Sequence, residues 1–449
     1  MTHDILKNPP EEADIVSGWR AERGHLVSVC MQVFNHARFL RDAFNSILNQ
    51  KTDFGFEIIV HDDASQDSSA DIIQEYAARY PSIVKPILQK INQYSQGIYP
   101  SLHFIYPRAR LPFVAMCEGD DHWTDKDKLQ VQVDGLTSRP EINFSFHRAK
   151  GLNFDETDHD EWICGDYSCT DTIVPFIDIL HRARGLIPFA SCMIRQQVKQ
   201  RLQAFQLARP YLTLGDLYCQ YFGALPNGAL FIAREMSVYR FRTDQSWTHK
   251  AFVDPAFKAR HETAMVRSYV ELDLLTGRQY HDSFRALILQ RILWLFNPTL
   301  PPRTLPEIDR WEEIHTACQD AIDRSLRNLA QAPARYVIFG CATGCQRVLD
   351  TIPLNRIVAI IDRDNRKIGD AINGKPVIGT DALEEHRDCE IIVSTITANR
   401  GAISRLTELA GIPSTNVHYM FDSALSAIDK LSIPAASQDS GCTLSSNGL

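Results

Sequence analysis

The chain has 449 residues, of which 44% are hydrophobic and 23% are charged, and 47 Lys and Arg against 55 Asp and Glu give a net charge of −8. This ordinary globular composition excludes collagen-like, coiled-coil and wholly disordered chains. The mild acidic excess provides neither the basic patch of a nucleic-acid-binding protein nor a polybasic membrane anchor. At roughly 100–200 residues per domain, the length predicts about three domains.

Cysteine usage and the apolar segments indicate a compartment. The eleven cysteines form no CxxC pair, which argues against a zinc ribbon or a thioredoxin-type site. The acidic N-terminus lacks the apolar core of a signal peptide. The stretch 286–296 is interrupted by Arg291 and is too short to cross a bilayer. We expect a cytoplasmic protein without a transmembrane segment, with peripheral attachment to the inner face of the membrane as an alternative.

The first half of the chain alternates short apolar runs with helical patterns. A polar lead-in covers residues 1–24, and the alternation that follows predicts a parallel α/β sheet. The predicted strands are 26–34, 56–60, 83–88 and 113–117, and the predicted helices are 38–49 and 70–80. Ligands bind such sheets at the carboxyl ends of the strands. Polar residues follow three of the runs directly, at 35–36, 62–63 and 118–121, and therefore mark a candidate site.

The second half of the chain has a different pattern. Long amphipathic helical stretches, broken by the proline-rich segment 297–306, predict a helical connector over 251–332. A second α/β pattern follows over 333–430. A Ser-rich tail over 431–449 is typical of disorder. Together with a first α/β domain over 25–250, these segments make up the predicted organisation.

Three motifs of the first half resemble those of the family 2 glycosyltransferases. They are VSVCMQVFNHARF, FEIIVHDDASQDSS and AMCEGDDHW, and they occur in the family's order at sensible spacing. The resemblance covers residues 26–250. It implies the GT-A fold, which binds a nucleotide-diphospho-sugar.

The resemblance assigns nucleotide contacts to the first two motifs. Val33, Phe34 and Asn35 would contact the nucleotide, and Asp62 or Asp63 would accept a hydrogen bond from the base. Uracil has an N–H group that a carboxylate can read, so UDP is the favoured carrier. The alternative for the two acids is a turn in which carboxylates cap a helix N-terminus.

The third motif stands where the family carries its Asp-x-Asp metal site. The resemblance implies that Asp120 and Asp121 bind Mn²⁺ or Mg²⁺, because hard divalent cations prefer carboxylate oxygens and offset the charge of a diphosphate leaving group. Glu118 replaces the more usual Asp, and Gly119 leaves room for the pyrophosphate to approach the backbone. A solvated acidic turn is the alternative.

An acceptor hydroxyl requires a general base. The family places an Asp at the start of a helix well after the metal motif, which corresponds here to Asp216. Asp166 is a weaker candidate. The segment 188–195 resembles the strand that lines the acceptor cleft, and His147 and Trp247 are candidates for its border. The resemblance implies an inverting, single-displacement reaction.

The C-terminal α/β pattern has Asp362 22 residues after Gly340, near the spacing of a Rossmann dinucleotide site. The glycine fingerprint is broken, however, because Ala342 and Cys345 replace two of its glycines. The segment is similar to small nucleotide-binding-like domains appended to sugar-modifying enzymes. A second nucleotide-sugar site, a regulatory site and a docking module all remain open.

We therefore expect a metal-dependent, inverting glycosyltransferase that moves a sugar from a UDP-linked donor to a hydroxyl acceptor in surface polysaccharide or glycoconjugate synthesis. Its expected partners are the nucleotide-sugar donor and a saccharide or glycoconjugate acceptor, without nucleic acid, and the helical connector could pair two copies of the chain. The alternatives are an NAD(P)-dependent oxidoreductase built on the C-terminal domain and a non-catalytic sugar-nucleotide-binding protein.

Overall fold

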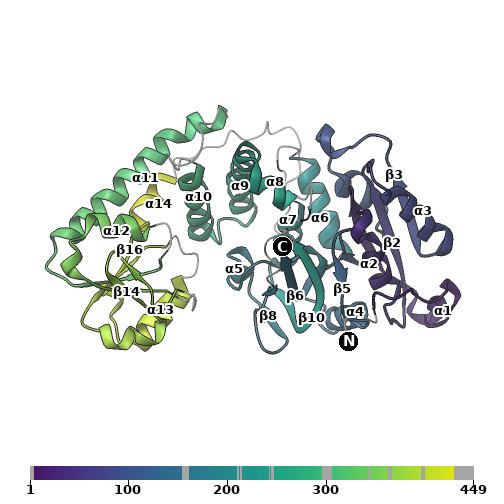
Figure 1. Cartoon of the computed structure of the whole chain (residues 1–449), viewed down its shortest axis with the longest axis horizontal. Coiled ribbons are helices and arrows are strands. Elements are labelled where there is room, and N and C mark those ends of the chain that lie inside the picture. The colour runs from purple at the N-terminus through teal and green to yellow at the C-terminus, as the bar shows by residue number, and fades with distance from the viewer. Residues whose placement is uncertain are drawn as a thin grey trace. The chain divides into compact units, whose positions relative to one another are not determined.

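The structure is a computed structural model. It describes residues 5–153, 161–209, 212, 215–241, 243, 247–295, 306–341, 344–362, 367–395 and 400–428. The chain divides into two compact units, with the boundary between Asp254 and Pro255. Each unit is considered by itself below (Figure 1).

The first unit is built on one mixed sheet, and ten of its strands lie in the described residues. The strand order is β3-β2-β1-β4-β9-β6-β10-β5, with β7 paired to β6 and β8 paired to β10. The strands are β1 (His25–Val33), β2 (Gly55–Asp62), β3 (Val84–Leu88), β4 (Phe113–Met116), β5 (His122–Trp123), β6 (Phe144–Asn153), β7 (Glu161–Cys164), β8 (Thr172–Val174), β9 (Met193–Arg195) and β10 (Ala229–Phe241). The helices are α1 (Glu12–Ser17), α2 (Ala37–Leu48), α3 (Ser69–Arg79), α4 (Lys128–Thr137), α5 (Phe176–Leu180), α6 (Gln196–Leu207), α7 (Gly215–Ala224) and α8 (Trp247–Val253).

The four predicted strands and two predicted helices of this unit are confirmed to within about two residues at each end. Strands β3, β2, β1 and β4 run parallel to one another. Near-continuous apolar runs form such strands because helices cover a parallel sheet on its faces. Helix α2 buries Leu40, Ala43, Phe44 and Ile47, an i, i+3, i+4, i+7 stripe that packs into the core shared with β1 and β2.

Residues 5–24 are packed against α2 and α3, although their composition predicts only a polar lead-in. Ile5 is buried, and Asn49 donates from its amide to the carbonyls of Ile5 and Lys7. Glu12 accepts the backbone N–H groups of Ser82 and Ile83. Side-chain amides and carboxylates therefore hold this segment by satisfying backbone groups.

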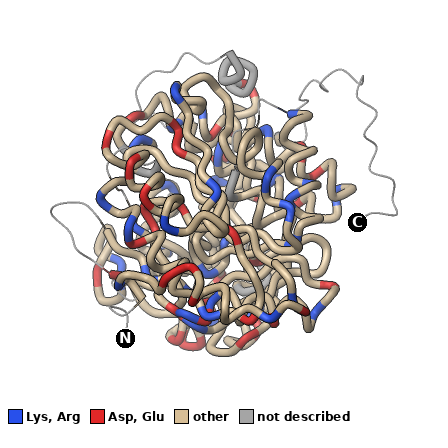
Figure 2. Tube along the Cα trace, turned by 90° about the vertical axis from the view of Figure 1, so that its right-hand side faces the viewer, with Lys and Arg blue, Asp and Glu red and all other residues tan. Residues whose placement is uncertain are grey.

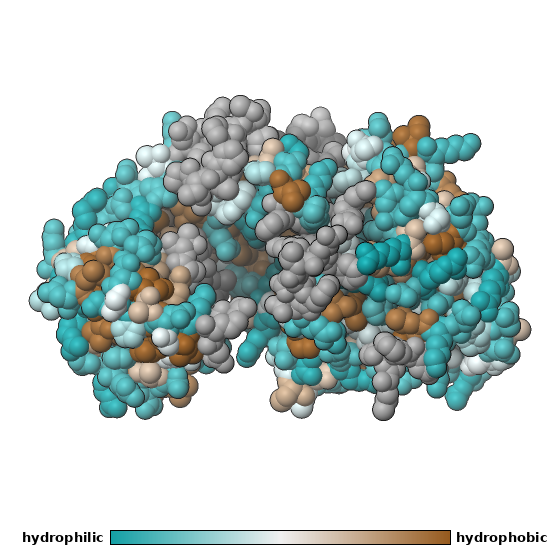
Figure 3. Space-filling view, viewed as in Figure 1, coloured by the Kyte–Doolittle hydropathy of each residue, from teal (hydrophilic) through white to brown (hydrophobic). Residues whose placement is uncertain are grey.

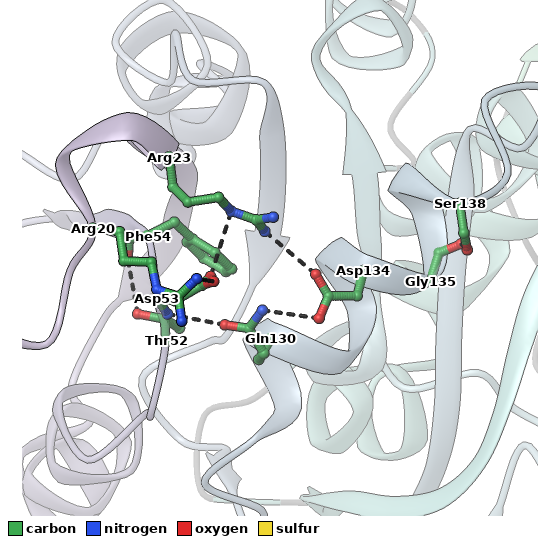
Figure 4. Close-up of polar contacts among 9 residues, drawn as sticks. All are labelled: Arg20, Arg23, Thr52, Asp53, Phe54, Gln130, Asp134, Gly135 and Ser138. Carbon is green, nitrogen blue, oxygen red and sulfur yellow. Dashed lines mark hydrogen bonds and ion pairs between the residues drawn. The ribbon is translucent and has the colours of Figure 1, made fainter.

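A polar cluster fastens the segment just before β1 to helix α4 (Figure 4). Arg23 lies between two carboxylates, 3.4 Å from Asp53 and 3.3 Å from Asp134. Gln130 accepts the N–H of Asp53 and donates to Asp134. Two of these contacts, Arg23 with Asp134 and Asp53 with Gln130, join residues 111 and 77 positions apart in the chain.

The second unit combines helices with a smaller sheet of strand order β13-β14-β12-β11-β15-β16. All neighbouring pairs are parallel except β13 with β14. The helices are α9 (Pro255–Leu275), α10 (His281–Leu295), α11 (Pro306–Gln331), α12 (Cys345–Thr351), α13 (Arg400–Leu409) and α14 (Asp422–Ile428). The strands are β11 (Tyr336–Phe339), β12 (Ile357–Ile361), β13 (Ala371–Ile372), β14 (Lys375–Ile378), β15 (Glu390–Val393) and β16 (Val417–Tyr419). The helices of the predicted connector thus share one unit with the second sheet.

The surface agrees with the composition. Acidic and basic residues are interspersed along the traced chain (Figure 2). The face in Figure 3 is largely hydrophilic, with apolar residues in small groups. Within the described ranges, no helix has both the length and the hydropathy needed to cross a bilayer.

Candidate functional site

The three polar motifs meet at one edge of the first sheet. Strand β1 lies between β2 and β4, and all three run in the same direction. Val33 at the end of β1 is paired with Asp62 at the end of β2. On the other side of β1, the N–H of Gly119 donates to the carbonyl of Gln32 over 3.0 Å. Residues separated by more than 80 positions therefore converge because the carboxyl ends of parallel strands share an edge.

The loops after β1 and β2 are hydrogen-bonded to each other. Asn35 adopts a left-handed backbone conformation with φ 57°, and its N–H donates to the Ser65 hydroxyl over 2.9 Å. Its side-chain Oδ1 accepts the N–H of Gln66 over 2.7 Å. Asn is one of the few residue types that adopts positive φ readily, because its side chain can bond locally.

Asp67 completes this connection between the loops. Its carboxylate accepts the N–H groups of Ala37 and Ser69, the first residues of α2 and α3, at 2.9 Å each. Burial raises the pKa of Asp67, but the hydrogen bonds from Ser69 and Ala37 outweigh it and hold the pKa below its ordinary value. The capping role considered for the acids of this motif thus belongs to Asp67, which caps two helices.

Asp62 and Asp63 are both buried but have different surroundings. Asp63 Oδ1 accepts the N–H of Gln93 over 2.8 Å, and its Oδ2 accepts the N–H of Tyr94 over 3.0 Å. Asp62 Oδ2 accepts the N–H of Ser65 over 3.1 Å, while its buried Oδ1 has no hydrogen-bond partner among the described residues. Asp63 therefore holds the loop that follows β3, whereas one oxygen of Asp62 has no partner among the described residues.

The acidic turn after β4 holds its two aspartates in different environments. Asp121 is 1% exposed, and its Oδ1 accepts the N–H of Arg240 over 2.9 Å. Burial, together with the neighbouring charges of Asp120 and Glu118, raises the pKa of the Asp121 carboxyl well above its ordinary value. The Asp120 carboxylate is 13% exposed. Its Oδ2 accepts the Thr243 hydroxyl over 2.8 Å, and its Oδ1 has no protein partner in the described part of the chain.

Gly119 is needed for close packing at the centre of the site. A Cβ atom at this position would lie 2.9 Å from Val33 Cγ2 and 2.9 Å from His36 Nδ1, and 3.3 Å from the Gln32 carbonyl oxygen. The His36 ring thus packs over the glycine, and its Nε2 lies 3.9 Å from Asp120 Oδ2. The expectation that Gly119 leaves room for pyrophosphate stays a prediction, since the contacts described here are with protein.

His36 is one of the polar residues that mark the candidate site in the sequence, but no role was predicted for Arg240, Thr243 or Asp42. All four surround the acidic turn. Arg240 is 7% exposed, and its guanidinium donates to the Asp120 carbonyl over 2.8 Å and to Asp42 Oδ2 over 2.7 Å. The sequence feature that could have pointed to Arg240 is its position between the aromatic residues Tyr239 and Phe241 at the end of a strand. Its partner lies 120 residues away, a separation that no local pattern encodes.

The residues predicted on the acceptor side are more dispersed. Asp216 is the second residue of α7, and its side chain lies outside the described part, as does that of Trp247. Asp166 accepts the Arg148 guanidinium at 2.6 Å, so its carboxylate is already paired. His147 is fully buried, and burial lowers the pKa of its imidazole well below the ordinary value. In the segment 188–195, Arg195 binds the carbonyls of Leu136 and Ile142.

The described residues offer neither an enclosed metal site nor a glycine-lined dinucleotide cradle. No group of three or more His, Cys, Asp and Glu side chains is arranged there to enclose a metal ion.

In the second unit, a Cβ at Gly340 would lie 2.3 Å from Thr395 Cγ2, and one at Gly344 would lie 2.1 Å from the Ser394 carbonyl oxygen. These glycines therefore allow close packing against β15, and this arrangement gives no support to a dinucleotide site. Ala342 lies outside the described residues.

Comparison with known proteins assigns a class to this site. The family model "Glycosyl transferase family 2" matches residues 28–198, which carry all three motifs. This match supports a glycosyltransferase domain of family 2 in this part of the chain. The expected enzyme class is thereby confirmed for the domain.

Relatives match parts of the chain. Uncharacterized protein Rv1520 of Mycobacterium tuberculosis is 40% identical over 121 residues, which cover 27% of this chain and 34% of the relative. TuaG of Bacillus subtilis, provisionally named a teichuronic acid biosynthesis glycosyltransferase, is 30% identical over 145 residues, 32% of this chain and 55% of TuaG. The chain thus spans only about a third of the length of the Mycobacterium relative.

Among solved structures, that of S. aureus TarS residues 1–349 in complex with UDP-GlcNAc is similar at 17% identity and a TM-score of 0.46. The match covers 67% of this chain and 83% of the TarS chain.

Proposed function

We propose that this chain transfers a sugar from a UDP-linked nucleotide-diphospho-sugar to a hydroxyl group of a saccharide or glycoconjugate acceptor. The observation that carries the proposal is the meeting of Asn35, Asp62 and Asp120 at the ends of adjacent parallel strands, where α/β sheets bind nucleotides. The name of TuaG, which refers to teichuronic acid biosynthesis, supports surface polysaccharide as the acceptor class.

Asp62 reads the base in this proposal. Its buried Oδ1 lacks a partner among the described residues, and leaving a buried acceptor unsatisfied costs about 1–3 kcal/mol. The N–H of uracil would satisfy this oxygen. Asp63 supports the site indirectly, because both of its oxygens hold the loop that follows β3. Val33, Phe34 and Asn35 line the nucleotide from β1.

Asp120 is the acid best placed to bind a divalent cation, because its Oδ1 is left without a protein partner in the described residues and its side chain is partly exposed. A lone carboxylate fits Mg²⁺ or Mn²⁺ bound chiefly through substrate phosphates and water, a mode that requires no three-residue cluster. When bound, such a cation neutralises the charge that develops on the diphosphate leaving group. Glu118 adds a further carboxylate beside it, whereas Asp121, whose pKa is raised by burial, lies in the protein interior.

Asp216, at the start of α7, is the general base of the proposal. It would take the proton of the acceptor hydroxyl as that oxygen attacks the anomeric carbon in a single displacement with inversion. Asp166 is less suited to this role because Arg148 holds its carboxylate in an ion pair.

A panel of UDP-sugars assayed by release of UDP, with Mn²⁺ or Mg²⁺ and with EDTA, tests the proposal. We expect one donor to be turned over only with the cation, and we expect D120N to abolish turnover. D216N should lose turnover while binding UDP as tightly as the unaltered chain. Undiminished turnover in EDTA and by D120N would overturn the cation role, and UDP-sugar binding without turnover on any acceptor would favour a non-catalytic binding protein.

A further inference from the structure

Arg240 joins three segments of the first unit through separate groups. Its backbone N–H donates to Asp121 Oδ1 over 2.9 Å, and its guanidinium donates to the Asp120 carbonyl and to Asp42 Oδ2. The guanidinium also lies 4.8 Å from the centre of the Phe39 ring. Strand β10 thereby links the acidic turn to helix α2.

The choice of atoms at Asp120 has a chemical consequence. The guanidinium bonds to the carbonyl of Asp120, and the Asp120 carboxylate is bonded instead by the neutral hydroxyl of Thr243. The arginine therefore brings positive charge to a turn that contains three acids without occupying the carboxylate. An arginine–carboxylate pair in its place would compete with a cation for the same oxygens.

Thr243 fixes the rotation of the Asp120 carboxylate. Thr243 is 1% exposed, and its hydroxyl bonds to Oδ2 over 2.8 Å. Because Oδ2 is held on one side, the other oxygen, Oδ1, has a defined direction. Binding a cation to a carboxylate that is already held in place costs less side-chain entropy than binding it to a freely rotating one.

We infer that Arg240 and Thr243 are positioning residues that hold Asp120 in the orientation in which it binds a divalent cation together with the donor diphosphate. The inference rests on the proposed function and adds to it two residues, one near the end of β10 and one just beyond it. A planar guanidinium with several donors can hold the Asp120 carbonyl and Asp42 at once, which a lysine cannot match.

Binding of Mn²⁺ tests this inference without turnover. Free Mn²⁺ is measured by electron paramagnetic resonance as it is titrated into the full chain in the presence of UDP. T243V replaces the hydroxyl with a methyl group of similar size, and we expect it to weaken Mn²⁺ binding about tenfold, whereas T243S should bind as the unaltered chain does. R240K should weaken binding by a similar factor. R234K, on the same strand with its partner Asp125 away from the turn, should have no effect.

Control measurements separate this inference from the proposed function. UDP affinity in EDTA should be the same for all four variants, and circular dichroism should show the same fold. If the unaltered chain binds Mn²⁺ and D120N does not, but T243V and R240K bind it normally, the positioning role is wrong while the proposed cation role survives. If the unaltered chain binds no Mn²⁺ with UDP, both fail. If R240K does not fold, T243V alone decides, since it removes one hydroxyl and no charge.

Discussion

The N–H of Asn35 donates to the hydroxyl of Ser65 across 2.9 Å, so two loops that lie 30 residues apart in the chain meet directly. The Asn35 side chain returns a second bond to Gln66, and Asp67 connects the same loops to α2 and α3. The two nucleotide motifs are therefore one structural element. A change in either loop should alter both.

The first prediction concerns the left-handed backbone of Asn35. N35A loses the bond to Gln66 and places a Cβ-bearing residue without local bonding at φ 57°, so we expect a loss of about 1–3 kcal/mol in the free energy of unfolding. N35G loses the same bond but tolerates the positive φ, and should cost less. Urea unfolding measures both. Equal losses for the two variants would show that backbone strain contributes nothing here.

The second prediction separates the two acids after β2. D62N should weaken UDP binding about tenfold in calorimetry. The neutral amide oxygen is a weaker acceptor for the N–H of the uracil base than the charged carboxylate oxygen that it replaces. In D63N the new side-chain NH₂ group faces the backbone N–H of either Gln93 or Tyr94, so that one hydrogen bond is lost. We expect the free energy of unfolding to fall by about 1–3 kcal/mol. Normal UDP affinity in D62N together with a severe loss in D63N would assign the base to Asp63 instead.

The third prediction concerns the space around Gly119. G119A places a methyl group 2.9 Å from both Val33 and His36, and overpacking of this kind costs typically about 1–3 kcal/mol. G18A is a matched control, since its Cβ would lie 3.4 Å from the nearest atom, the Ile15 carbonyl oxygen, at a negative φ. Thermal or urea unfolding should show a clear loss for G119A and a small change for G18A. Equal stability of the two variants would mean that the His36 ring moves aside freely.

The fourth prediction is a pH dependence of stability from Lys128. This lysine is fully buried, donates to Gln132 over 2.7 Å and lies 4.1 Å from the centre of the Trp123 ring. Burial lowers the pKa of Lys128 to about 7 from its ordinary 10.5. Between these two values the unfolded chain binds a proton that the folded chain does not, so stability rises as pH increases from about 7 to 10.5.

K128M lacks this titration. The difference in free energy of unfolding between the unaltered chain and K128M should therefore change with pH in that window, by up to a few kcal/mol in favour of the unaltered chain at the higher pH. Urea unfolding at pH 7.0 and 9.5 measures it. A difference that stays constant across this range would show that Lys128 remains charged when folded.

The sequence by itself determined the elements of the first sheet and the place of the candidate site. Short continuous apolar runs that alternate with helical patterns favour buried parallel strands, and polar residues that follow such strands gather at one edge of the sheet. The strand and helix bounds around Asn35, Asp62 and Asp120 follow from this local pattern. The packing of residues 5–24 does not follow from the local pattern. It depends on Asn49, Glu12 and other side chains that form hydrogen bonds with distant backbone groups.

Only the tertiary structure decided what each acid does. Asp62 and Asp63 are neighbours of the same residue type, yet loop contacts satisfy both oxygens of Asp63 and leave one oxygen of Asp62 without a partner among the described residues. Asp120 and Asp121 also differ in their surroundings, because Arg240 and Thr243 reach the turn from 119 and 123 positions along the chain. Hydrogen-bond partners and burial set the role of a carboxylate, and both depend on which distant strand packs beside it.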